Sequence, residues 1–309
     1  MTDPVRLARV ATLMLLAVTA VWGSTFFLIR DLVATVPAAD FIAVRFAIAA
    51  LVMLVLFRRQ TLALSRADLR LGAGLGVLYG LAQLLQTVGL QHTAASVSGF
   101  VTGTYVVLTP VLAALLLRDR IDAVTWGAAL LTTAGLAVLS LRGFSVGYGE
   151  GVTLASAVLY AGHIVVLGRW STPSAAVGLA TVQAGVIAGI TAVAAVPGGL
   201  TLPDGTGQWA SLLYMAVVAG AAALWAQTWA QAHLTATRAA IVMAMEPVFA
   251  ALFAVLLGGE DATTRLLVGG GLVVASMYLV ELRGVLARRR RRGATAADDP
   301  PVEALHHDV

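Results

Sequence analysis

The strongest constraint on this chain is a succession of apolar blocks, each long enough to cross a lipid bilayer, separated by short polar connections. A helix needs about 20 apolar residues to span a hydrocarbon core of roughly 30 Å. Charged residues make up 12% of the sequence, whereas soluble proteins carry about 25%. The pattern predicts an all-α integral membrane protein with ten transmembrane helices. The predicted spans cover residues 9–29, 38–57, 71–90, 95–117, 123–141, 150–168, 175–196, 208–230, 237–257 and 264–282.

The arginines predict the orientation of these spans. All 20 basic residues are arginine. With the N-terminus in the cytoplasm, 16 of them fall in cytoplasmic segments and 3 in outer segments, as the positive-inside rule requires. We therefore expect both termini in the cytoplasm, residues 1–8 as a short N-terminal segment, and residues 284–309 as a basic and then disordered tail. The basic run Arg288–Arg292 fits an orientation signal, with binding of anionic lipid as the alternative and no nucleic-acid partner expected.

Two residue types are missing from the sequence, which has no lysine and no cysteine. A Walker A phosphate loop and a Schiff-base cofactor both need lysine, and disulfides and thiolate metal sites need cysteine. No cofactor and no metal site are therefore predicted.

The sequence also repeats itself. A shift of 137 to 138 residues places Pro110 on Pro247, each followed by Val-x-Ala-Ala-Leu, and places Trp22 on Tyr160 and Arg45 on Gln183. We predict two five-helix units, residues 9–141 and 150–283. Because each unit has an odd number of helices, the second would enter the membrane upside down, as in secondary transporters with inverted repeats. Chance similarity between apolar helices is the alternative.

Several motifs together resemble the EamA-type transporters of the drug/metabolite transporter superfamily. They are Ala20-Val21-Trp22-Gly23-Ser24-Thr25-Phe26, Arg45, residues 86–93 and 99–103 leading to Pro110, Met245-Glu246-Pro247-Val248-Phe249 and Gly259-Glu260. The resemblance covers about residues 10–283. It implies a ten-helix bundle with a central cavity in the cell's inner (plasma) membrane that moves a small organic solute, commonly outward.

Polar side chains inside the spans indicate where such a cavity would lie, because a polar group facing lipid is costly. Many of them recur every three or four residues, which places them on one face of a helix. The stripes are Tyr79, Gln83 and Gln86; Ser98, Thr102, Tyr105 and Thr109; and Thr153, Ser156, Tyr160 and His163. The alternative is that each serine and threonine bonds its own helix backbone or bridges packed helices.

Arg45 and Glu246 are charges well inside the spans, where each needs a compensating partner. They could pair, or Arg45 could hold an anionic solute group while Glu246 holds a cation or a coupling proton; a fixed network that orders the helices is the alternative. Tryptophans could add apolar walls. The predicted substrate-cavity residues are Trp22, Ser24, Thr25, Arg45, Tyr79, Gln83, Gln86, Ser98, Thr102, Tyr105, Tyr160, His163, Trp225 and Glu246.

These features favour a secondary transporter or facilitator of small amino-acid-like metabolites or drugs that works by alternating access. Its expected partners are the solute, a proton or another coupling ion, and the lipid bilayer; no oligomeric state is predicted. A membrane-embedded enzyme is one alternative, but the sequence has no His-Glu-x-x-His motif and no pair of intramembrane aspartates, so we do not expect an enzyme. A receptor or assembly factor that transports nothing is the other alternative.

Overall fold

The computed structural model describes residues 4–93, 95–118, 120–140, 147–258 and 263–279. These residues form helices and connections, and no β-strand occurs among them. The predicted fold class is thereby confirmed as all-α. The helices of the first half are α1 (Pro4–Gly23), α2 (Phe26–Val33), α3 (Ala38–Leu62), α4 (Arg66–His92), α5 (Ala95–Gly103), α6 (Tyr105–Leu117) and α7 (Ala123–Ser140).

The second half begins with α8 (Tyr148–Trp170) and α9 (Ala176–Ala195). A helical segment with a π-turn in its middle follows. Its parts are α10 (Thr206–Ala216), the π-helical turn η2 (Val217–Ala222) and α11 (Ala223–Gln231). The remaining helices are α12 (Ala236–Met243), α13 (Glu246–Gly258) and an unlabelled helix over residues 264–279, and the short 3-10 turn η1 (Val196–Gly198) follows α9.

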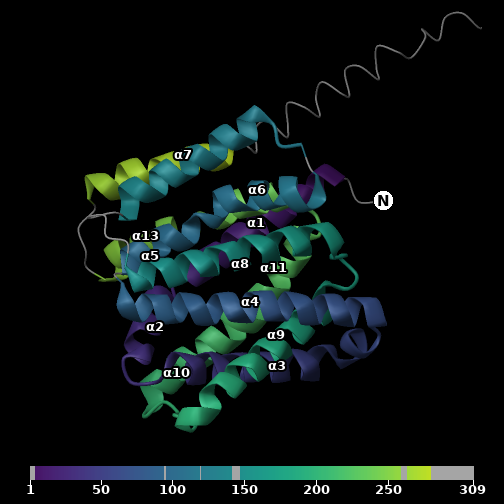
Figure 1. The fold of residues 1–309 in the computed structure, drawn as a ribbon. Coiled ribbons are helices and arrows are strands. Elements are labelled where there is room, and N and C mark those ends of the chain that lie inside the picture. Colours follow the sequence, from purple (N-terminus) through teal and green to yellow (C-terminus); the bar gives the residue numbers. More distant parts are fainter. Residues whose placement is uncertain (1–3, 94, 119, 141–146, 259–262, 280–309) are drawn as a thin grey trace, which may run out of the picture.

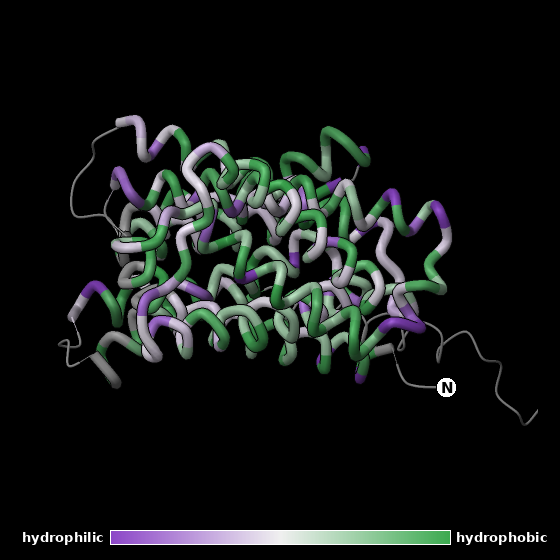
Figure 2. The backbone as a smooth tube through the Cα atoms, turned by 90° about the horizontal axis from the view of Figure 1, so that it is seen from below, coloured by the Kyte–Doolittle hydropathy of each residue, from purple (hydrophilic) through white to green (hydrophobic). Residues whose placement is uncertain are grey.

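Seven helical segments in the described residues are long and apolar enough to cross a membrane, so this is a multi-pass membrane protein. Two shorter apolar helices, Ala123–Val138 and Thr264–Leu279, coincide with predicted spans. The count of ten crossings stays a prediction. In Figure 2 the hydrophilic positions gather mainly towards the two ends of the bundle. Large apolar side chains such as Leu51, Val55 and Leu115 are more than 60% exposed on its sides, as lipid-facing residues should be.

The described helices differ from the predicted spans mainly at their ends. The segment predicted as one helix over residues 9–29 is divided at Ser24–Thr25, where both hydroxyls donate to carbonyls of the preceding turn. Ser65 caps α4 by accepting from the Asp68 backbone N–H, which extends this helix about one turn beyond the predicted start at residue 71. Breaks at Thr104 and at residues 244–245 come shortly before Pro110 and Pro247, consistent with the helix-disrupting effect of proline.

The bundle interior is formed by helices of one half packing on helices of the other. α4 packs on both α8 and α9, and α3 packs on α9. Figure 1 accordingly shows α4 between α8 and the layer of α9 and α3. Gly72, Gly76 and Gly80 make the close approach of α4 to α9 possible, since a Cβ atom at Gly76 would lie 2.7 Å from Val186 Cβ.

Candidate functional site: a polar cavity between the two halves

A cavity lies within the bundle, between helices α1 to α6 of the first half and α8, α11, α12 and α13 of the second. The centres of water-sized spheres can occupy about 70 Å³ of it. A single water needs roughly 10–15 Å³ by this measure, so several waters or a small solute would fit. Every predicted cavity residue except Ser24 and Trp225 lines it: Trp22, Thr25, Arg45, Tyr79, Gln83, Gln86, Ser98, Thr102, Tyr105, Tyr160, His163 and Glu246.

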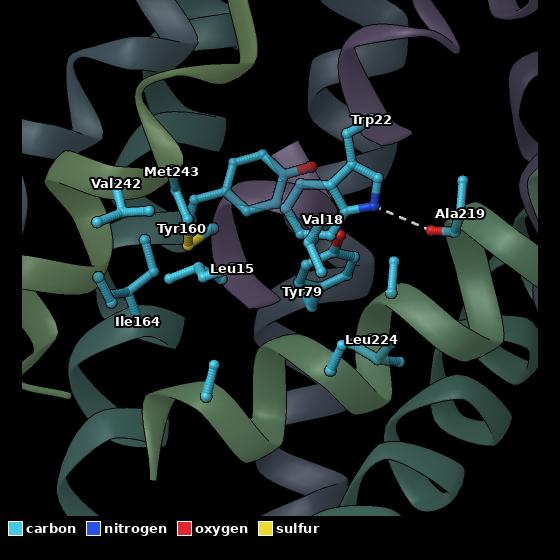
Figure 3. Close-up of a cluster of buried hydrophobic side chains, with 14 of the residues drawn as sticks. Leu15, Val18, Trp22, Tyr79, Tyr160, Ile164, Ala219, Leu224, Val242 and Met243 are labelled. Carbon is cyan, nitrogen blue, oxygen red and sulfur yellow. Dashed lines mark hydrogen bonds between the residues drawn. The ribbon is translucent and has the colours of Figure 1, made fainter. Parts of the chain in front are cut away.

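Arg45 is held by two backbone carbonyls of the second half, one at the end of α10 and one in the π-turn. Its Nε donates to the carbonyl of Met215 at 3.0 Å, and one terminal nitrogen donates to the carbonyl of Ala219 at 3.3 Å. The Ala219 carbonyl also accepts from the Trp22 indole N–H at 2.9 Å, the bond drawn in Figure 3. A π-turn changes the usual backbone pairing and is common at functional sites. Here its backbone holds the guanidinium and the indole in fixed positions.

A chain of hydrogen bonds crosses one wall of the cavity. Gln83 Nε2 donates to the Tyr160 hydroxyl at 2.7 Å, and that hydroxyl donates to Gln86 Oε1 at 2.9 Å. Gln86 Nε2 then donates to the Thr102 hydroxyl at 3.2 Å. The chain joins α4, α8 and α5, so the predicted stripes on three helices do meet. Thr153 instead bonds its own helix, because its hydroxyl donates to the carbonyl of Gly149.

His163 belongs to a second, deeper network. Its Nε2 lies 2.8 Å from Gln183 Oε1 on α9, and Gln183 Nε2 donates to the Thr228 hydroxyl on α11 at 3.5 Å. The imidazole also meets the Tyr79 ring edge to face, with centroids 5.1 Å apart. His163 is thus fixed by helices of its own half and by an aromatic ring of the other half.

Glu246 lines the cavity near Arg45. Within the described part of the chain it makes no ion pair, and no side-chain hydrogen bond reaches its carboxylate. The hypothesis of a direct pair with Arg45 is therefore not seen; the two charges share one cavity. Glu246 begins α13, where the positive end of the helix dipole favours a carboxylate. Gly23 packs closely behind it, since a Cβ atom there would lie 3.0 Å from the Glu246 carbonyl.

Two of the predicted cavity residues do not line the cavity, and three residues that do line it were not predicted. Ser24 bonds the Val21 carbonyl and the Tyr214 hydroxyl instead of facing the cavity, and Trp225 is a half-buried residue outside the lining. The lining includes Thr87, Gln227 and Met243, which the stripes did not predict. Gln227 had one signal, since a glutamine in an apolar span is itself unusual.

The cavity therefore offers a cation, a carboxylate, hydroxyl and amide groups, and the rings of Trp22, Tyr79, Tyr105 and Tyr160. Within the described residues no cluster of potential metal ligands occurs. Such a site can bind and orient a small polar solute with an apolar portion. A multi-pass helical membrane protein with a cavity lined by polar and aromatic side chains is the class that fold and site define.

Comparison with known proteins places the chain within this class. It belongs to the EamA-like transporter family, which matches residues 9–141 and, separately, residues 147–282. A protein of Archaeoglobus fulgidus described as an uncharacterized transporter is 31% identical over 274 residues, covering 88% of this chain and 86% of that protein. A solved crystal structure superposes with a TM-score of 0.75 and 20% identity, covering 91% of this chain and 98% of the other. The family points to a transporter rather than an enzyme.

Proposed function

We propose that this protein is a secondary transporter or facilitator that moves a small amino-acid-like metabolite or drug across the cell's inner membrane by alternating access. The observation that carries the proposal is the central cavity, which gathers both intramembrane charges and residues of both halves. Arg45 suits a carboxylate, Glu246 suits an ammonium group, and the aromatic rings suit an apolar side chain. A small zwitterion matches this set. The outward direction and the cytoplasmic termini rest on the family resemblance and on the arginine distribution.

Reciprocal packing supports the proposal of two inverted repeats. α1 packs against α11, α12 and α13, and its counterpart α8 packs against α4, α5 and α6. α4 packs against α9, just as α10 and η2 pack against α3. The family also matches once in each half. Two similar halves in opposite orientations can exchange conformations, which would give outward-open and inward-open states of similar energy.

The carboxylate of Glu246 has two candidate roles, and they predict different results. If it carries a coupling proton, Glu246→Gln abolishes the pH dependence of flux. If it binds the solute's ammonium group, the same variant weakens solute affinity by about 10-fold or more, for a lost charge-assisted bond of about 1.5–3 kcal/mol. Unchanged flux, affinity and pH dependence would exclude both roles.

The proposal is tested with the purified protein in proteoliposomes and a mixture of labelled amino acids, amines and amphipathic drugs. We expect protein-dependent flux of one chemical class that an excess of the unlabelled compound inhibits. Thr133→Ala serves as a control variant, because this hydroxyl donates to the Ala129 carbonyl of its own helix and Thr133 is not among the residues that line the cavity. Flux no faster than in protein-free liposomes across the whole mixture would refute the proposal.

A further inference from the structure

One ring nitrogen of His163 is buried in the cavity wall without a hydrogen-bond partner. His163 lines the cavity, and its side chain is 0% exposed. Nε2 of the ring lies 2.8 Å from Gln183 Oε1, whereas Nδ1 has no partner among the residues that the structure describes. Buried polar atoms in native proteins nearly always have a partner. A solute in the cavity is a source of the one that Nδ1 lacks.

The hydrogen bonds around the imidazole decide which ring nitrogen carries the proton. The Thr228 hydroxyl donates its hydrogen to the Leu224 carbonyl at 2.7 Å, so it can only accept from Gln183. The amide nitrogen of Gln183 therefore faces Thr228, and its amide oxygen faces His163. An amide oxygen only accepts, so Nε2 carries the hydrogen of that bond and Nδ1 of the neutral ring is a bare acceptor. A second proton, on Nδ1, would bury a charge and an N–H without an acceptor.

The position of the ring leaves Nδ1 for the cavity. Nε2 points to Gln183 on α9, which does not line the cavity, and Nδ1 lies on another edge of the ring. The Tyr79 ring meets the imidazole edge to face with centroids 5.1 Å apart, and Tyr160 meets Tyr79 in the same way at 5.4 Å. Both tyrosines line the cavity. The imidazole is thus fixed between α9 and the aromatic part of the cavity wall.

A neutral acceptor beside aromatic rings suits an uncharged donor of the solute. The charged groups of a zwitterion have better partners in the same cavity, which are Arg45 and Glu246, because hydrogen bonds between ions are about twice as strong as neutral ones. An O–H or N–H group in the solute's side chain has the polarity that Nδ1 requires, and the tyrosine rings suit the carbon atoms that carry it. A site with a buried acceptor also discriminates against an analogue that lacks the donor.

We propose that Nδ1 of His163 is a specificity-determining acceptor that binds an uncharged O–H or N–H group in the side chain of the solute. This role rests on the proposed function for its solute, and it names the class of that solute: an amino-acid-like compound with a hydrogen-bond donor in its side chain. Gln183, held in turn by Thr228, keeps the proton on Nε2 and thereby keeps Nδ1 free to accept.

Binding to the purified protein in detergent tests this role with two pairs of probes. Serine differs from 2-aminobutyrate by a hydroxyl in place of a methyl group, and tyrosine differs from phenylalanine by a hydroxyl on a longer side chain. The apparent Kd of each probe follows from the rise of the unfolding temperature with its concentration. In at least one pair the hydroxyl compound should bind about 3- to 10-fold more tightly, as expected for one hydrogen bond. Equal affinities within both pairs, or no binding of any probe, would overturn the proposal.

Two replacements of His163 separate the roles of the two ring nitrogens. An asparagine amide lies near the position of Nδ1, and a glutamine amide lies near that of Nε2. His163→Asn should keep most of the preference for the hydroxyl probe but lower the unfolding temperature, because the bond to Gln183 is lost. His163→Gln should unfold at a temperature closer to that of the natural protein and bind both members of the pair equally. The opposite pattern would assign the solute to Nε2 and overturn the proposal.

Gln183→Leu gives the same information if neither His163 variant folds. Gln183 does not line the cavity, so the Kd of the hydroxyl-free probe should change less than about twofold. Without Gln183 the ring can carry its proton on either nitrogen, so the preference for the hydroxyl probe should fall by about twofold or more. An unchanged preference would contradict the role of Gln183 in keeping Nδ1 free.

Thiol labelling tests whether the cavity reaches His163, because the sequence contains no cysteine. Methyl methanethiosulfonate, which is small and crosses membranes, should modify His163→Cys and leave Gln183→Cys unmodified. Equal labelling of the two would refute the placement of His163 between cavity and α9. None of these measurements needs transport. Hydroxyl-selective binding without flux would therefore refute the proposed function and leave the role of His163 standing, and flux without hydroxyl-selective binding would do the reverse.

Discussion

Replacing Gly23 by alanine tests the contact between the two halves at the site. Gly23 ends α1, and a Cβ atom there would lie 2.8 Å from the Ala250 backbone nitrogen, 2.8 Å from Phe249 Cβ and 3.0 Å from the Glu246 carbonyl. Two of these atoms belong to the backbone of α13 and cannot rotate away. Overpacking of this kind costs about 1–3 kcal/mol, and the higher helix propensity of alanine returns at most about 1 kcal/mol. With that gain subtracted, Gly23→Ala should lose up to about 2 kcal/mol of stability.

The matched control is Gly74→Ala. Gly74 is an exposed residue of α4, and a Cβ atom there would meet nothing within 4 Å. This variant should gain about 0.5–1 kcal/mol from helix propensity alone. Both are measured as apparent unfolding temperatures in one detergent, where about 1–2 kcal/mol corresponds to roughly 2–8 °C. If Gly23→Ala unfolds at or above the temperature of Gly74→Ala, the packing of α1 on α13 described here is wrong.

Three further substitutions separate the roles of the polar residues. Arg45→Lys should lose about 1–3 kcal/mol of stability in detergent unfolding, because an ammonium group cannot replace the fork that bonds two backbone carbonyls; unchanged stability would contradict this. Tyr160→Phe removes the hydroxyl that joins Gln83 to Gln86. Solute affinity in the flux assay should therefore fall about 5-fold or more, which corresponds to a loss of about 1 kcal/mol. An unaltered affinity would count against a role of Tyr160 in the cavity. Ser24→Ala should change solute affinity less than about twofold, because Ser24 bonds outside the lining; a loss as large as that of Tyr160→Phe would show the opposite.

Hydrophobic block length predicted the helical character well. Bilayer thickness and helix rise set that length, so it depends on local sequence alone. The positions at which the helices are interrupted were predicted less well. The divisions at Ser24–Thr25 and at the π-turn Val217–Ala222 depend on side-chain bonds and on packing with other helices. An ordinary run of valine, alanine and glycine forms the π-turn, and nothing in that composition distinguishes it from a regular helix.

The site was predictable where one helical face carries several large polar groups. Tyr79, Gln83 and Gln86 all line the cavity as their spacing predicts. Residue spacing shows which side chains share a helix face, but not how that helix is rotated against its neighbours or where it ends. Thr109 continues the stripe of Tyr105, yet it is buried and does not line the cavity. The bonds of Arg45 to backbone carbonyls had no sequence signal, because any residue supplies a carbonyl.

Close contacts between helices at glycine residues are also only partly predictable from residue spacing. Gly72 and Gly76 are in close contact with α9, since an added Cβ atom would lie 3.0 Å from Val182 at Gly72 and 2.7 Å from Val186 at Gly76. Gly103 packs against Leu136, but a Cβ atom at Gly99 would meet nothing within 4 Å. Small residues at a spacing of four permit a close approach of two helices, and the remaining contacts of the bundle decide whether it occurs.

Labelling of a cysteine inside the cavity tests the central claim most directly. Ser98 is 2% exposed and lines the cavity, so Ser98→Cys changes little besides the reactive atom. The account predicts that an impermeant thiol reagent modifies Ser98→Cys when applied from either side of the membrane, and that the transported solute slows both reactions. Modification from one side alone, or rates that the solute does not change, would contradict an alternating-access site at this cavity.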